Sequence, residues 1–98
     1  MKQESEKLIE KNLGIAVKKL KGYCLKFWPI TVTGFPDRII LLPGGKVCFA
    51  ELKSTGKTPS PMQRLWIGRL VKLGFWVEVI DTTEKLKSFT EKLAAWQN

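Results

Sequence analysis

The sequence predicts a single α/β (α+β) domain in which helices flank one mixed, four-stranded sheet. Three segments carry apolar residues at helical spacing, and four short apolar runs are typical of strands. A helix separates the last two strands, which implies a crossover and a parallel pairing. The predicted order is helix, three strands, helix, strand, helix. With 98 residues, 44% of them hydrophobic, the chain supports one domain over residues 1–98.

The first helix is expected from about residue 3 to 21. Its apolar positions at helical spacing are Ile9, Leu13, Ala16 and Leu20. Gly22 follows and is suited to a left-handed cap. Residues 23–30 are typical of a strand that ends near Pro29, and residues 30–35 of a loop.

A hairpin is predicted over residues 37–53, and its register depends on the length of its turn. A two-residue turn at the glycines would leave the carboxylates of Asp37 and Glu51 on different faces. A three-residue connection over Pro43-Gly44-Gly45 instead pairs Leu42 with Lys46. It sets Asp37 directly opposite Glu51, with Cβ atoms about 5 Å apart. Proline followed by glycine suits this longer turn, so we predict it, or a bulge with the same phase.

Ser60 is the predicted N-cap of the second helix, with Pro61 at the first helical position and Gln63 completing a capping box. The stripe expected to be buried consists of Met62, Trp66, Leu70 and Leu73. A buried strand is predicted over residues 75–80, and the last helix from about residue 81. Its buried stripe consists of Leu86, Phe89, Leu93 and Trp96.

The charge of the chain favours a polyanionic partner. It has 17 basic and nine acidic residues, a formal charge of +8, and such a surplus on a small domain indicates nucleic acid. A basic surface that only keeps the domain soluble is the alternative. Asp37 and Glu51 are the only acids between Glu10 and Glu78. Isolated carboxylates in basic surroundings are candidates for a function.

The cysteine and histidine content excludes several kinds of site. Cys24 and Cys48 are the only cysteines and there is no histidine, which excludes a zinc finger within this chain, a serine or cysteine triad, and His-Asn-His nuclease chemistry. No secretory signal or membrane-length apolar segment is recognisable. We therefore expect free buried thiols, a cytoplasmic location and no membrane partner.

The predicted hairpin brings chemistry-bearing side chains together. Glu51 and Lys53 share one face of their strand because side chains alternate, and Asp37 is expected opposite Glu51. Two carboxylates and an ammonium group can hold a divalent metal beside a phosphate. The structural alternatives are that Asp37 opens a turn after proline and that Glu51 and Lys53 line a solvated edge.

Other polar and aromatic positions have two interpretations each. Glu10 borders the buried stripe of the first helix and could reach a cleft, or could pair with a neighbouring lysine. Gln63 has a sufficient role in the capping box. Trp28, beside Pro29, could stack on a base or line a subunit contact, whereas the other tryptophans are expected in the core.

Four motifs together resemble the virus-type replication-repair nuclease (VRR-Nuc) family. They are Gly34-Phe35-Pro36-Asp37-Arg38, Leu42-Pro43-Gly44-Gly45-Lys46-Val47, Glu51-Leu52-Lys53 and Ser60-Pro61-Met62-Gln63. This family belongs to the PD-(D/E)XK superfamily of metal-dependent nucleases, and the resemblance extends from the first helix to the last strand. It implies a restriction-endonuclease-like core of order αβββαβα.

The resemblance also implies a metal site. Asp37 and Glu51 are expected to ligate Mg²⁺ or Mn²⁺, with the backbone carbonyl of Leu52 as a further oxygen ligand. Lys53 is expected to orient the attacking water and steady charge on the phosphate. The cation would polarise the scissile phosphate and help to generate hydroxide, leaving a 5′-phosphate and a 3′-hydroxyl as in this superfamily.

The remaining assignments concern the rim of that site and the DNA. Glu10 is expected to complete the acidic cluster, with Glu6 as the alternative if the helix phase differs. Gln63 is expected to touch metal-bound water, Lys53 or the phosphate. The basic residues expected to contact DNA are Lys26, Arg38, Lys46, Lys57 and Arg64.

Small stand-alone members of this family are similar to Holliday-junction resolvases and tend to be dimers. We therefore expect a Mg²⁺-dependent, structure-selective endonuclease that acts on branched DNA as a homodimer, without an organic cofactor. The same chemistry on flaps, nicks or duplex DNA is one alternative. A basic nucleic-acid-binding module without catalysis is the other.

Overall fold

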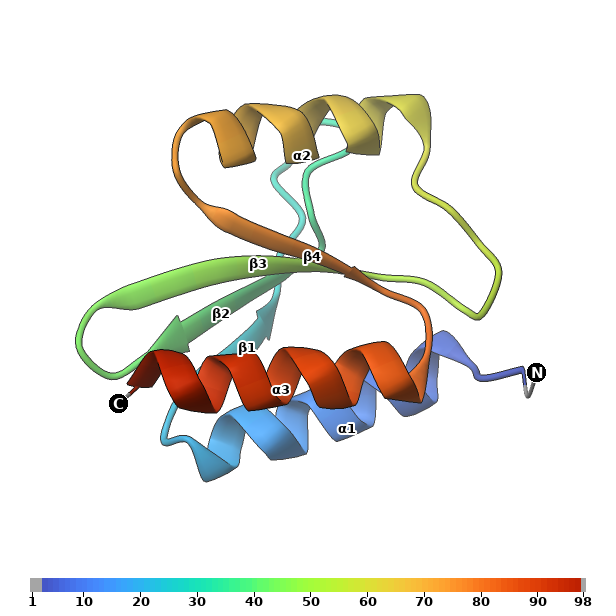
Figure 1. Ribbon diagram of the computed structural model, residues 1–98. Coiled ribbons are helices and arrows are strands. Elements are labelled where there is room, and N and C mark those ends of the chain that lie inside the picture. The colour runs from blue at the N-terminus through green and yellow to red at the C-terminus, as the bar shows by residue number, and fades with distance from the viewer. Residues whose placement is uncertain (1–2, 98) are drawn as a thin grey trace.

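Helices cover both faces of a four-stranded sheet in the computed structural model, which describes residues 3–97 (Figure 1). The helices are α1 (Glu6–Lys19), α2 (Pro61–Lys72) and α3 (Thr83–Gln97). The strands are β1 (Tyr23–Lys26), β2 (Arg38–Leu42), β3 (Lys46–Leu52) and β4 (Trp76–Ile80), and they lie in the order β1-β2-β3-β4. The first two pairings are antiparallel and β3 pairs with β4 in parallel. The predicted αβββαβα order is confirmed.

The register of the β2–β3 hairpin is the one that the three-residue connection requires. Leu42 pairs with Lys46, and the ladder runs to the pair Arg38–Ala50. Gly44 and Gly45 have φ angles of 84° and 73°, a region that glycine enters without steric cost. One position beyond the last pair, Asp37 therefore comes into register with Glu51.

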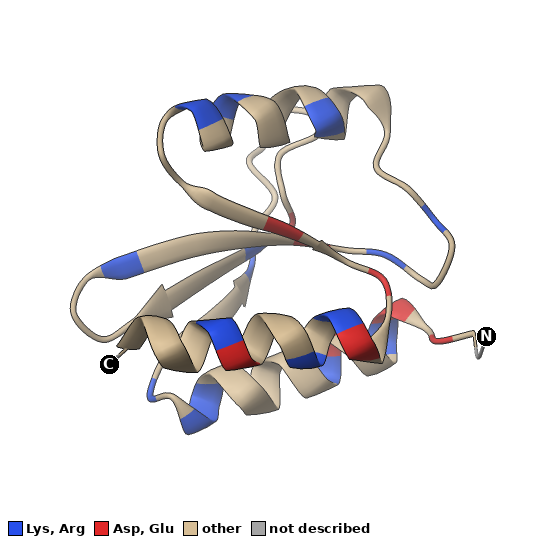
Figure 2. Cartoon of the chain, in the orientation of Figure 1, with Lys and Arg blue, Asp and Glu red and all other residues tan. Residues whose placement is uncertain are grey.

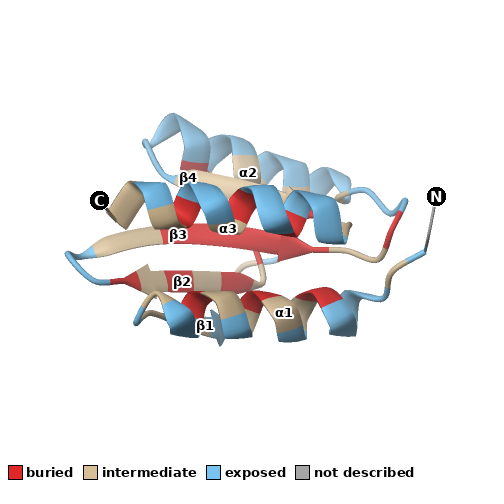
Figure 3. Cartoon of the chain, turned by 60° about the horizontal axis from the view of Figure 1, so that its bottom comes forward, coloured by how far each residue is buried: buried red, intermediate tan, exposed pale blue. Residues whose placement is uncertain are grey.

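The main core lies between the sheet and the pair α1 and α3 (Figure 3). Buried side chains of the strands on this face are Ile40, Leu42, Cys48, Ala50, Leu52 and Ile80. From α3 come Leu86, Phe89 and Leu93, as predicted, with Trp96 packed against them. The buried stripe of α1 is Ile9, Leu13 and Val17. Val17 takes the place of the predicted Ala16, and both Ala16 and Leu20 are only half-buried.

The turn after α1 differs from the predicted cap. Lys21, not Gly22, has the left-handed φ of 66°. Gly22 is required for a different reason, because a Cβ atom there would lie 2.5 Å from the carbonyl oxygen of Leu41 on β2. The glycine lets the chain pass close to the sheet. β1 is also shorter than predicted, since the strand ends at Lys26.

Helix α2 covers the opposite face through a cluster of aromatic rings. The contacting rings, with centroids 5.4 to 5.5 Å apart, are those of Phe27, Phe35, Phe49, Phe75 and Trp66. The predicted buried stripe of α2 is wrong at both ends, since Met62 is 43% and Leu73 74% exposed. The helix is rotated so that Gln63, rather than Met62, reaches the sheet, where it bonds to Glu51.

Residues near the N-terminus hold the loop after β3. The Glu4 N–H donates to Thr55 Oγ1 at 2.8 Å, and Thr55 Oγ1 donates to the carbonyl of Asp81 at 2.9 Å. The Glu4 carboxylate accepts from the N–H of Thr83, the first residue of α3, at 2.9 and 3.0 Å. These bonds fix the backbone that leads away from Lys53. No helix within residues 3–97 is long and apolar enough to cross a membrane.

Candidate active site

The candidate site lies where β2 begins and β3 ends, on the face that α2 covers. Asp37 immediately precedes β2, and its backbone carbonyl accepts from the Phe27 N–H at 2.9 Å. Its Oδ1 accepts from the Leu52 N–H at 3.3 Å. Asp37 is thus tied by its backbone to the segment after β1 and by its side chain to the end of β3.

Glu51 lies beside it and is almost completely buried, at 2% exposure. Its Oε2 accepts from Gln63 Nε2 at 3.1 Å and lies 3.9 Å from Lys53 Nζ. Its Oε1 is buried without a hydrogen-bond partner among the described residues. A buried carboxylate oxygen without a partner is costly, and a cation would satisfy it.

The electrostatics of the two carboxyl groups also indicate a cation. Burial, followed by the charge of Asp37, raises the pKa of Glu51 to about 7, and the Lys53 ammonium opposes the shift. Burial also raises the pKa of Asp37, and the charge of Arg38 opposes it. Two carboxylates that repel each other at low exposure become stable together when a positive ion binds between them.

Gln63 forms the predicted capping box and also contacts the candidate site. Its Oε1 accepts from the Ser60 N–H at 2.8 Å and its N–H donates to Ser60 Oγ, which completes the predicted capping box. Its Nε2 donates to Glu51. The capping box therefore orients the amide that holds the buried carboxylate. Lys53 has 20% of its side chain exposed and Asp37 has 16%, so both are partly open to solvent.

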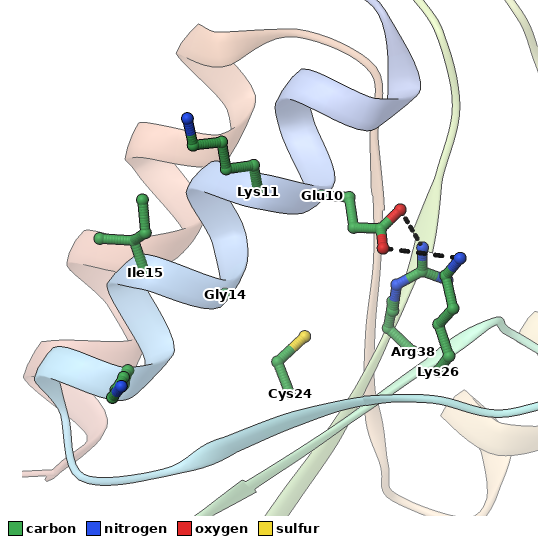
Figure 4. A pocket seen from close by; sticks show the side chains of 8 residues that line it. Glu10, Lys11, Gly14, Ile15, Cys24, Lys26 and Arg38 are labelled. Carbon is green, nitrogen blue, oxygen red and sulfur yellow. Dashed lines mark ion pairs between the residues drawn. The ribbon is translucent and has the colours of Figure 1, made fainter.

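Glu10 does not join this group. Its Oε2 lies 2.9 Å from Arg38 Nη2 and its Oε1 3.6 Å from Lys26 Nζ (Figure 4). Arg38 belongs to the core face of β2, opposite the face of Glu51, and Glu10 meets it there. The predicted completion of the acidic cluster by Glu10 therefore does not fit its position.

Glu6, the alternative, acts on the site from the first turn of α1. Its charge is among the causes that raise the pKa of both Asp37 and Glu51. No group of three or more cysteine, aspartate or glutamate side chains in the described part of the chain is arranged to hold a metal ion. Two carboxylates with a backbone carbonyl and waters still fit Mg²⁺, which usually keeps several waters and binds through one or two carboxylates.

The basic residues predicted to contact DNA are placed in different surroundings. Lys57 and Arg64 are exposed, the first in the loop before α2 and the second near the start of the helix. Figure 2 shows basic positions along α2 and in the loop before it. Lys26 is half-exposed and lies over the Trp28 ring, 5.5 Å from its centroid. A DNA contact by Arg38 does not fit a side chain that is buried against Asp37 and Glu10.

Lys46 lies at the other end of β3, about 20 Å from the site by strand geometry. Its ammonium group bonds to the Trp96 carbonyl and lies over the Trp96 ring. Lys46 therefore stabilises the hairpin against the end of α3.

The two contacts of Arg38 were the main feature that the sequence prediction missed. The available signal was the alternation of side chains, which puts Arg38 on the face of α1 when Asp37 faces α2.

Comparison with known proteins gives relatives in sequence and in fold. No family model matches the sequence. "Putative nuclease p44" of Acyrthosiphon pisum secondary endosymbiont phage 1 is 40% identical over 79 residues, which are 81% of this chain and 85% of the relative. A solved chain described as "VRR_NUC domain" has the same fold, with a TM-score of 0.82 and 24% identity over 90% of this chain and 97% of that one. The chain belongs to the same family as this phage relative and has the VRR-Nuc fold.

Proposed function

We propose that this chain is a Mg²⁺- or Mn²⁺-dependent DNA endonuclease that acts on branched DNA. One observation carries the proposal: the Asp37 carboxylate bonds to the Leu52 N–H, next to buried Glu51, whose Oε1 lacks a partner within residues 3–97. Lys53 lies on the same face, 3.9 Å from Glu51. This is the combination of hard oxygen ligands and an ammonium group that phosphodiester hydrolysis needs.

Each residue has a defined task in the proposed reaction. Asp37 and Glu51, with the Leu52 carbonyl, would hold the cation, and Gln63 keeps the Glu51 carboxylate oriented. When bound, the cation supplies a Lewis acid for the scissile phosphate and lowers the pKa of water. Lys53 orients the attacking water and stabilises negative charge that develops on the phosphate.

The surface near the site suits a DNA backbone. Lys57 and Arg64 are exposed, and the formal charge of +8 favours association with a polyanion. Because one chain carries one such site, two cuts in a four-way junction of near two-fold symmetry need two chains. We therefore propose a homodimer. Trp28, which is 73% exposed, remains a candidate contact, whereas Trp96 packs on Trp76.

The test is cleavage of a synthetic four-way junction with Mg²⁺ by the parent, Asp37→Asn and Lys53→Met proteins. We expect both variants to lose at least about 100-fold in rate, because each removes a group that acts in the transition state. Glu84→Gln and Lys87→Met, at exposed positions of α3, are controls with the same charge changes. Flaps, nicked DNA and plain duplex test the preference for branched substrates.

The contrary result is equally clear. If Asp37→Asn and Lys53→Met cut as fast as the parent, these residues are not the catalytic group. If the parent binds DNA with a steep salt dependence but does not cleave it with any divalent metal, the chain is a binding module.

A further inference from the structure

Three charged side chains connect α1 to the candidate site at the start of β2. Arg38 Nη2 lies 2.9 Å from Glu10 Oε2, and Arg38 Nη1 lies 3.3 Å from Asp37 Oδ2. The same Nη1 donates to the backbone carbonyl of Asp37 at 3.0 Å. One planar guanidinium group therefore contacts two carboxylates and the backbone of a proposed metal ligand. Figure 4 shows its ion pair with Glu10.

Because Arg38 is buried, its positive charge requires negatively charged partners. Only 3% of its side chain is exposed, compared with 36% for Glu10 and 16% for Asp37. A buried guanidinium group cannot lose its proton and needs negative partners. Among the described residues, its two ion-pair partners are Glu10 and Asp37. The charge of Glu10 thus decides how much of the compensation must come from Asp37.

Glu10 is accessible from the surface, with 36% of its side chain exposed. A pocket of about 360 Å³ opens between α1 and β1, lined in part by Glu10, Lys11, Lys18 and Lys26 (Figure 4). Lys26 balances part of the Glu10 charge at 3.6 Å. Glu10 is therefore a partly exposed side chain on one side of the sheet. It forms an ion pair with the buried Arg38 guanidinium group, which also contacts Asp37.

We propose that Glu10 and Arg38 are a positioning pair for Asp37, and that Glu10 influences the metal through Arg38 rather than as a ligand. The inference rests on the proposed function of Asp37 as a metal ligand. With Glu10 in place, Arg38 orients Asp37 Oδ2 while a second carboxylate shares its charge. Without Glu10, Asp37 alone balances the positive charge of Arg38. The Asp37 carboxylate then interacts less strongly with a metal ion.

The pathway through Arg38 is tested by a double-mutant cycle on metal binding, without DNA. Mn²⁺ affinity is measured by titration calorimetry for the parent, Glu10→Gln, Arg38→Met and the double variant. We expect Glu10→Gln to weaken Mn²⁺ binding about tenfold when Arg38 is present. In the Arg38→Met protein the same change is expected to alter the affinity less than about twofold, because the connecting cation is missing.

Glu6→Gln is the matched comparison on the same helix. Its charge acts on Asp37 and Glu51 directly, so it should weaken Mn²⁺ binding by the same factor with or without Arg38. Thermal unfolding of each variant in EDTA separates loss of folding from loss of affinity. Arg38→Met removes the shared partner of two carboxylates, which is expected to destabilise the fold. If Arg38→Met does not fold, Arg38→Gln takes its place in the cycle.

Two results would overturn the positioning role. Equal weakening by Glu10→Gln in both backgrounds would make Glu10 a ligand or a through-space charge, and no weakening in the parent background would remove it from the site. A parent protein that binds no Mn²⁺, or one that Asp37→Asn leaves unchanged, would instead overturn the proposed function, and this inference with it.

Discussion

Glu51 is held in the folded protein under conditions that oppose its ionisation. It is 2% exposed, and Asp37 adds a second negative charge beside it. In the absence of metal, this arrangement costs folding free energy whenever Glu51 is charged. Binding of a cation removes that cost, which couples the stability of the hairpin end to the proposed cofactor.

The pH dependence of the free energy of unfolding should show this cost of ionising Glu51. Because burial raises the pKa of Glu51 from 4.5 to about 7, the folded state binds more protons than the unfolded state between these values. The contribution of Glu51 to stability is therefore present below about pH 4.5 and lost as the pH rises to about 7. We expect Glu51→Gln to remove this decline, which is on the order of 3 kcal/mol.

The measurement is urea unfolding in EDTA between pH 4.5 and 8 for the parent and Glu51→Gln proteins. The difference between the two proteins isolates Glu51 from Asp81, whose pKa is lowered by its bond to Lys85 and which acts in the opposite direction. Parallel stability curves for parent and variant would mean that Glu51 titrates normally. Addition of Mg²⁺ at pH 8 should stabilise the parent more than the variant.

At the scale of elements, the passage from α1 to β1 depends on one glycine. A Cβ atom at Gly22 would lie 2.5 Å from the Leu41 carbonyl oxygen and 2.7 Å from the Leu42 side chain. We expect Gly22→Ala to destabilise the fold by about 1–3 kcal/mol, because α1 or β2 must move. The free energy of unfolding in urea measures the loss.

Gly14 provides the matched control for Gly22. It lies inside α1, and a Cβ atom there meets no atom within 4 Å. Gly14→Ala should therefore stabilise the protein by about 0.5–1 kcal/mol through helix propensity. A similar loss at both positions would show that the contact with Leu41 does not limit residue 22.

The same scale explains how far the sequence predicted the elements. All seven elements and the hairpin register were predicted, because alternation, helical spacing and the Pro-Gly-Gly turn are local signals. The buried face of α2 was not predicted correctly. Met62 and Gln63 are neighbours in the sequence, and it is Gln63 that faces the sheet. The choice between them was made by Glu51 on another element.

At the scale of the whole molecule, the proposed homodimer predicts coupled cutting of the two strands of a junction. Parent protein mixed with an excess of Asp37→Asn protein forms mixed dimers with one competent site. On a plasmid with an extruded cruciform, we expect nicked circles to replace linear product, because only one strand is cut before the complex dissociates. Gel analysis of the two products measures the change.

The matched control for this mixture is an excess of the exposed Glu84→Gln variant, which should leave linear product dominant. If the Asp37→Asn excess lowers both products in proportion, each chain acts independently and the dimer proposal is wrong. Sedimentation of the parent at the same concentration gives the oligomeric state directly.

The sequence by itself determined the order of the elements, the phase of Asp37 against Glu51 and the surplus of positive charge. These depend on spacing and composition, which are properties of neighbouring residues. Only the tertiary structure decided the partners of Glu10, Arg38 and Gln63. The reason is that long charged and amide side chains can reach several neighbouring groups. Which neighbour they meet depends on how α1 and α2 pack on opposite faces of one sheet.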